Sequence, residues 1–285
     1  MGSLAQDTQG AVRSGPTQRE FWIGAGRAFA GAIIFSAPVL MTQETWNLGV
    51  SMAPHRLALL LAVMIPVLVS LNRYSGFRKG GELKDWLADA FVAMLVAALA
   101  AAVVLATFGV ITADMPMHEI VGKIGLQTVP GSLGATLARS QLGSGNPLDD
   151  PDAPGPGYAS ELFLMVVGAL FLSFNIAPTE EVMLIAYKMT EWQLLGLILG
   201  SLCLMHLFVY EFEFQGAHDP EPGAGFVSIF FRYSVVGYIL VMAVNLYILW
   251  TFGRSDGVAP GELLNAVVVL SFPGALGAAV ARLIL

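Results

Sequence analysis

Residues 173–181, with the sequence SFNIAPTEE, place a proline and two adjacent glutamates inside an otherwise apolar run from Leu162 to Tyr187. A helix needs about 20 mostly apolar residues to cross the hydrocarbon core of a bilayer, and this run is long enough. An ionisable side chain at that depth costs about 2.5–3.5 kcal/mol on insertion scales, so it usually faces a cavity or a partner. The stretch therefore predicts both a membrane-spanning helix and a candidate functional site.

The composition of the whole chain agrees with a membrane location. Of its 285 residues, 56% are hydrophobic and 12% are charged, and the mean hydropathy is +0.70. Soluble proteins carry about 25% charged residues. These values predict an all-α, polytopic membrane protein whose main partner is the lipid bilayer. The net charge of −7 gives no reason to expect a nucleic-acid partner, and the single cysteine excludes an intramolecular disulfide.

Eight stretches of the chain are interpreted as transmembrane helices. They are residues 27–51, 56–71, 86–112, 119–138, 162–187, 193–210, 226–252 and 263–285. The fourth stretch contains Lys123, Gln127 and Pro130, so an amphipathic surface helix is the alternative there. Residues 1–26 are expected to form a disordered cytoplasmic tail. Residues 140–158 are rich in Gly, Pro and Asp and are expected to form a linker.

An internal repeat supports the fourth span. Without a gap, residues 119–139 (EIVGKIGLQTVPGSLGATLAR) align with residues 262–282 (ELLNAVVVLSFPGALGAAVAR). The identical positions include the pairs Glu119/Glu262, Pro130/Pro273, Gly131/Gly274, Leu133/Leu276, Gly134/Gly277, Ala135/Ala278, Ala138/Ala281 and Arg139/Arg282. Shared Gly and Ala can arise from helix packing alone, but shared Glu, Pro and Arg at fixed spacing favour duplication. We therefore expect two four-helix halves, residues 27–139 and 159–285.

The first and fifth spans align in two different registers. One register pairs Ser36 with Ser173, Thr42 with Thr179, Glu44 with Glu181 and Met52 with Met189. The other pairs residues 37–38 with residues 177–178, which are Ala-Pro in both cases, and loses the glutamate pair. We prefer the first register because it matches more residue types.

The two repeats are expected to be parallel. An even number of spans in each half gives both halves the same orientation, related by an axis along the membrane normal, unlike the inverted repeats of many transporters. Lys and Arg gather on the side of the spans where the termini lie, which predicts cytoplasmic termini by the positive-inside rule. Glu44 and Glu181 would then lie in the outer third of their spans.

The expected metal site consists of residues whose side chains offer oxygen ligands. They are Glu44, Glu181, Glu180, Thr42, Thr179, Glu119 and Glu262. Together with carbonyl groups freed by Pro38 and Pro178, they suit Ca²⁺ or another hard cation. Carboxylates held close together at low dielectric also take up a proton when no cation is bound. Competition between the two suggests an exchanger, whereas the same ring without alternating access would be a channel filter.

Less specific interpretations apply to several of these residues. The prolines can be packing kinks only, and Glu119 and Glu262 can be ordinary residues of a helix N-terminus, where the helix dipole favours a carboxylate. Cys203 and His206 suggest a soft-metal site, but the second span has no counterpart, so we prefer a packing role for His206. The sequence carries no phosphate-binding loop, serine elbow or histidine metal motif, so neither enzyme activity nor a covalent cofactor is expected.

The Ala-Pro and Thr-Glu elements at residues 177–180 and the paired Pro-Gly…Arg spans resemble a family of bacterial integral membrane proteins classed as a domain of unknown function. The resemblance covers most of the chain from about Arg19 onward. It implies a multi-pass protein of the bacterial inner membrane and brings no assigned activity. Residues 175–180, NIAPTE, are also similar to the Gly-Asn-x-Pro-Glu signature of cation/Ca²⁺ exchangers, but they lack its glycine. This second similarity implies shared chemistry only.

The leading hypothesis from the sequence is membrane transport of Ca²⁺ or another hard cation through an acidic site between the first and fifth spans. Coupling of this transport to protons stays open. The alternative is a non-transport membrane protein, an assembly or sensor subunit, whose acidic pockets are structural or bind a regulatory ion. The sequence leaves the ion, the direction of transport and a homo-oligomeric state open.

Overall fold

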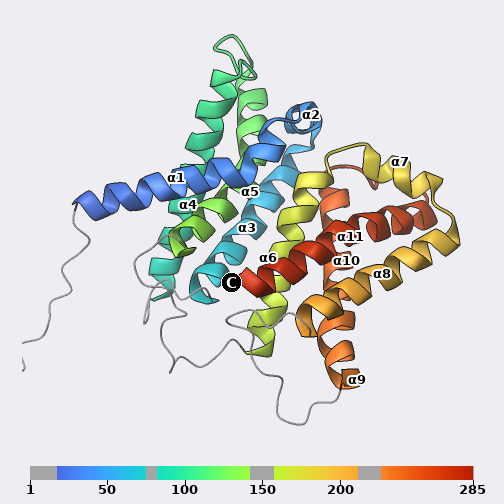
Figure 1. Ribbon diagram of the computed structural model, residues 1–285. Coiled ribbons are helices and arrows are strands. Elements are labelled where there is room, and N and C mark those ends of the chain that lie inside the picture. Colours follow the sequence, from blue (N-terminus) through green and yellow to red (C-terminus); the bar gives the residue numbers. More distant parts are fainter. Residues whose placement is uncertain (1–17, 75–81, 142–156, 211–225, 285) are drawn as a thin grey trace, which may run out of the picture.

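The protein consists of helices in the part of the chain that the structure describes, residues 18–74, 82–141, 157–210 and 226–284 of a computed structural model (Figure 1). In chain order the helices are α1 (Gln18–Leu40), α2 (Gln43–Ser51), α3 (Pro54–Tyr74), α4 (Leu83–Thr107), α5 (Met117–Gln141), α6 (Tyr158–Ile176), α7 (Glu181–Lys188), α8 (Glu191–Tyr210), α9 (Phe226–Ile229), the π-helix η2 (Phe230–Val235), α10 (Val236–Thr251) and α11 (Pro260–Ile284). The three elements before α11, which are α9, η2 and α10, follow one another without a gap.

Seven of the described helices are long and apolar enough to cross a membrane. The candidate spans are Trp22–Leu40, Pro54–Arg73, Leu83–Thr107, Tyr158–Ile176, Glu191–Phe208, Phe230–Thr251 and Pro260–Ala281. The chain is therefore an all-α, polytopic membrane protein, as its composition predicted. Residues 1–17 of the expected tail and most of the expected linker lie outside the described residues, whereas residues 18–26, also expected in the tail, belong to α1.

Helix α5, the expected fourth span, is not among the seven although it has 25 residues. Its polar residues and glycines lower its hydropathy. It is nevertheless an interior helix, because every residue from Leu126 to Thr136 is buried. Helices α1, α2, α3 and α4 all pack against it. This burial excludes the alternative of an amphipathic surface helix, which would expose one whole face.

The first and fifth expected spans are each split into a long helix and a short one, which corrects the continuous spans 27–51 and 162–187. Helix α1 ends at Leu40, and residues 41–42 separate it from α2. Helix α6 ends at Ile176, and residues 177–180 separate it from α7. Pro178 cannot donate a helical hydrogen bond to the Phe174 carbonyl, and the chain turns there. In the first case Thr42 is extended, with φ −108° and ψ 128°, so the helix cannot continue through it.

Two pairs of glycines bring helices into backbone contact. Gly31 of α1 faces Gly134 of α5, and Gly168 of α6 faces Gly277 of α11. At each of these positions an added Cβ would overlap the backbone of the other helix. Small residues allow membrane helices to approach this closely and gain van der Waals contact. Each pair of helices is therefore held at a distance that the glycines set.

The helices gather in two groups, with α1 to α5 on the left of Figure 1 and α6 to α11 on the right. The groups meet where α3 contacts α6 and α10, and where α6 contacts α1 and α5. Side chains from both groups enter one core, including the buried Leu126 and Leu133 from the first group and Phe174 and Phe252 from the second. The two groups thus form one packed unit.

Candidate functional site

The three glutamates expected at membrane depth lie at the beginnings of short helices. Glu44 is in the first turn of α2 and is half-buried. Glu181 is in the first turn of α7 and is exposed, as is Glu180 directly before it. These positions follow from the two helix breaks. Because the helix dipole favours a carboxylate at an N-terminus, this placement needs no buried partner.

Thr42 and Thr179 use their hydroxyl groups at the ends of the preceding helices. Thr42 Oγ1 donates to the carbonyl of Val39 at 3.0 Å, and Thr179 Oγ1 donates to the carbonyl of Ile176 at 2.8 Å. In both cases the acceptor lies three residues earlier, so the two threonines make the same bond relative to their breaks. The structure gives both residues a role in ending a helix.

Glu119 and Glu262 lie in the first turns of α5 and α11, where the first is half-buried and the second exposed. Among the residues that the structure describes, no three His, Cys, Asp or Glu side chains are close enough to hold a metal ion. The five predicted carboxylates are therefore not gathered into one cluster. Their role in binding a cation stays a prediction.

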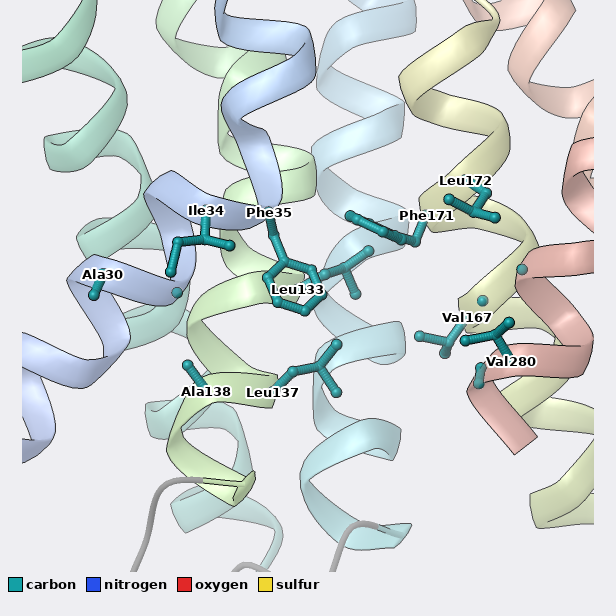
Figure 2. Close-up of a pocket in the computed structure, with 14 residues that line it drawn as sticks. Ala30, Ile34, Phe35, Leu133, Leu137, Ala138, Val167, Phe171, Leu172 and Val280 are labelled. Carbon is teal, nitrogen blue, oxygen red and sulfur yellow. The ribbon is translucent and has the colours of Figure 1, made fainter. Parts of the chain in front are cut away.

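The space between α1 and α6, where the acidic site was expected, is lined by carbon. The ring centroids of Phe35 and Phe171 lie 5.0 Å apart. Around them is a half-open cavity of about 430 Å³ between the two groups of helices (Figure 2). We call it the apolar crevice; its lining includes Ile34, Phe35, Leu133, Val167, Phe171 and Leu172. No carboxylate of the described chain lines it, so it offers no ligand to a cation.

A cluster of buried polar side chains lies instead within the second group, where α6, α10 and α11 meet. Asn245 Nδ2 donates to Ser271 Oγ at 3.0 Å. Ser173, Asn245 and Ser271 are each 0% exposed. A Cβ on Gly274 would stand 2.7 Å from Ser173 Oγ and 3.1 Å from Asn245 Nδ2. Both polar groups therefore pack directly against this glycine, and we call these four residues the polar cluster.

Two oxygen atoms of the polar cluster, Ser173 Oγ and Asn245 Oδ1, have no hydrogen-bond partner among the described residues. Ser271 Oγ donates its hydrogen to the carbonyl of Val267 at 2.7 Å. Asn245 must therefore be the donor in its bond to Ser271, which leaves Oδ1 as an acceptor. An unsatisfied buried polar group costs about 1–3 kcal/mol, and a bound ion or water commonly explains one in a native structure. The polar cluster is thus suited to a small polar ligand.

Further polar side chains extend from the polar cluster along the second group. The Tyr238 hydroxyl lies beside the hydroxyls of Ser201 and Ser271. Farther along α8, His206 Nδ1 lies 3.0 Å from Ser234 Oγ in the π-helix. Segments of π-helix are rare and are frequent at functional sites. The bond to Ser234 agrees with the packing role preferred for His206.

The sequence interpretation missed the polar cluster because it followed charged residues. A signal was present, since Asn245 interrupts the apolar stretch VMAVNLYILW of residues 241–250. Polar side chains inside a span are candidates for interhelical hydrogen bonds and for function even when they are uncharged. What the sequence could not show is that Ser173, from a different span, packs against the same glycine as Asn245.

Arg56 of α3 joins the two groups at the end of the molecule where α10 meets α11. Its Nη1 donates to the carbonyl of Trp250 at 2.8 Å, and its Nη2 donates to Asp256 Oδ1 at 2.9 Å. The guanidinium also lies 4.9 Å from the centroid of the Trp250 ring. The hydrogen bond from Arg56 lowers the pKa of the Asp256 carboxyl below its usual value. This contact ties together segments that are 200 residues apart.

Acidification is expected to weaken this link. Because the pKa of Asp256 is lower in the folded protein, the ionised carboxylate stabilises the fold above the ordinary aspartate value of 3.8. That stabilisation is lost as the pH falls through the lowered pKa. Thermal unfolding in detergent as a function of pH measures it, with Asp256→Asn as the control. A difference between the two proteins that stays constant on acidification would contradict the prediction. The effect is small, because Asp256 is exposed.

Comparison with known proteins identifies the family of the chain. The family model described as "Putative integral membrane protein (DUF2391)" matches residues 24–285. A search of curated proteins and a search of solved structures each found no match. The matched residues include all of the helices except the first residues of α1. The chain therefore belongs to the integral membrane protein family DUF2391.

Proposed function

We propose that the protein transports a small cation across the membrane and that the polar cluster is the binding step on its path. This keeps the cation transport expected from the sequence and moves the buried part of the path into the second group of helices. The glutamates at the starts of α2 and α7 then serve to attract the cation, since negative charge raises the local concentration of cations.

The observation that carries the proposal is the pair of unpartnered oxygens, Ser173 Oγ and Asn245 Oδ1, in fully buried residues. Ser36, which pairs with Ser173 in the preferred register, behaves differently. Its hydroxyl donates to the carbonyl of Ala32 at 2.6 Å, the usual bond of a serine inside a helix. Ser173 makes no such bond among the described residues, which supports a ligand in the polar cluster.

The chemistry of the polar cluster favours a monovalent cation or a proton over Ca²⁺. Its ligands are hydroxyl and amide oxygens, and the cluster contains no carboxylate. Protein sites for Ca²⁺ generally include Asp or Glu carboxylates among 6–8 oxygen ligands. A divalent ion held by neutral groups alone at low dielectric would remain uncompensated. We therefore take Na⁺, K⁺ and H⁺ as the cations to test, with Ca²⁺ as the comparison.

The proposal includes eight spans arranged as two parallel four-helix repeats, with both termini in the cytoplasm of a bacterium. Matched features support it. Thr42 and Thr179 make the same bond at the two helix breaks. Met52 and Met189 are both C-caps whose N–H groups bond to the residue four positions earlier. The two pairs of facing glycines lie in corresponding helices. These features match the register that pairs Glu44 with Glu181.

Ion flux into proteoliposomes tests the proposal. We expect flux of at least one of Na⁺, K⁺ and H⁺ above the level of protein-free vesicles. Ser173→Ala removes one ligand, and Gly274→Ala places a methyl group against Ser173 Oγ. Each should lower that flux about tenfold, equivalent to about 1.4 kcal/mol of lost ligand interaction. Ser36→Ala is the matched control and should leave the flux unchanged.

Two outcomes would overturn the proposal in different ways. The absence of cation flux with a correctly folded protein would exclude transport and favour the assembly or sensor alternative. Flux that survives both Ser173→Ala and Gly274→Ala would keep transport but remove the polar cluster from the path. Glu44→Gln with Glu181→Gln tests the outer carboxylates separately. Their loss should lower the flux mainly at low ionic strength, where surface charges are least screened.

A further inference from the structure

We propose that the apolar crevice binds one acyl chain of an anionic phospholipid from the surrounding membrane. The crevice has walls from both groups of helices: α1 and α5 on one side, α6 and α11 on the other. Figure 2 shows Ile34, Phe35, Phe171 and Leu172 around it. Because its lining is carbon, the site rejects a headgroup, a peptide backbone or an ion, each of which would lose hydrogen bonds without replacement.

The surroundings identify the occupant as a lipid chain. Helices α1, α6 and α11 are all candidate membrane spans, so a bilayer around them would supply lipid chains at the open side of the crevice. Its volume of about 430 Å³ falls within the range of about 300–1,000 Å³ typical of ligand sites. The walls are also preformed, because facing glycines fix α1 against α5 and α6 against α11. A flexible lipid chain can fill such a rigid apolar crevice and make van der Waals contacts with its walls. These contacts are lost when the crevice is unfilled.

Positive charge at one end of the crevice favours an anionic headgroup. Arg27 lies three residues before Ala30 on α1 and so shares a helix face with this lining residue. Arg27 therefore places positive charge beside the crevice, where the headgroup of a lipid bound in it would lie.

Native mass spectrometry of the full chain in mild detergent tests the inference. The protein is incubated with equal amounts of phosphatidylglycerol and phosphatidylethanolamine before measurement. We expect the wild type to retain one lipid, mostly phosphatidylglycerol. Ala30→Phe places a ring at an exposed position of the crevice wall and should abolish retention. Ala58→Phe, at an exposed position of α3 outside the crevice, is the matched control and should retain the lipid.

The remaining outcomes separate the parts of the inference. Arg27→Gln should keep one bound lipid but reduce the preference for phosphatidylglycerol. If the Ala30→Phe variant retains as much lipid as the wild type, the crevice is not the binding site. If the wild type retains both lipids equally, the bound lipid is not selected for an anionic headgroup. A lipid-free dimer that Ala30→Phe converts to monomer would show that a second copy of the chain covers the crevice. This inference does not depend on the proposed transport function.

Discussion

Replacing Gly168 by alanine is expected to destabilise the protein by about 3 kcal/mol, at the upper end of the usual cost of overpacking. The new Cβ would overlap the carbonyl oxygen of Gly277 and crowd the Cβ of Ala281. These atoms belong to a helix backbone and a short side chain, so neither can rotate away. Helices α6 and α11 would have to separate along their crossing. Thermal unfolding in detergent should show a midpoint lowered by roughly 5–10 °C.

Gly196→Ala in α8 is the matched control for this experiment. It is the same substitution inside a candidate span, but nothing lies within 4 Å of the added Cβ. Alanine favours a helix interior over glycine by about 1 kcal/mol, so this variant should be as stable as the wild type or slightly more so. Equal stability of the Gly168 and Gly196 variants would show that α6 and α11 do not pack through backbone contact.

Gly122→Ala is expected to have the second largest effect. The added Cβ on α5 would overlap the carbonyl oxygen of Gly49, which belongs to the short helix α2. Helix α2 would be displaced, and with it Glu44, one of the proposed outer carboxylates. We expect a loss of about 2–3 kcal/mol from overpacking. Hydrogen exchange should also become faster in residues 43–51 than in α5, because a displaced helix opens locally.

Gly125→Ala, one turn farther along α5, is the control. There the nearest atom to an added Cβ is the Cδ2 of Leu57 at 3.3 Å, the far end of a flexible side chain. That leucine can adjust by a few tenths of an ångström, so the change should be close to neutral. If Gly122→Ala lowered the stability no more than Gly125→Ala, this result would contradict the close packing of α2 on α5.

Much of the helical architecture could be predicted from the sequence because it rests on local properties. The apolar runs predicted the spans, since their length and hydropathy do not depend on distant contacts. The similarity between residues 119–139 and 262–282 favours an internal repeat, which stays a prediction. The two helix breaks were missed because each lies within a longer stretch that is apolar overall, whereas the backbone turns at residues 41–42 and 177–180.

The candidate site was harder to predict, because hydropathy alone does not tell which residues face each other. The sequence directed attention to Glu44 and Glu181 as charges within spans, but the breaks move them to the starts of α2 and α7. It also suggested an acidic space between α1 and α6, where the structure has the phenylalanine pair Phe35 and Phe171. Whether the glutamates bind a cation is a question for the flux experiments.

The sequence by itself determined that this is an all-α, multi-pass membrane protein, because solvation by lipid acts on each apolar segment separately. Only the tertiary structure decided that Ser173, Asn245 and Ser271 meet beside Gly274, and that the space between α1 and α6 is apolar. The physical reason is that buried polar contacts depend on helix rotation and crossing, which the close-packed glycines fix through contacts between residues far apart in the chain.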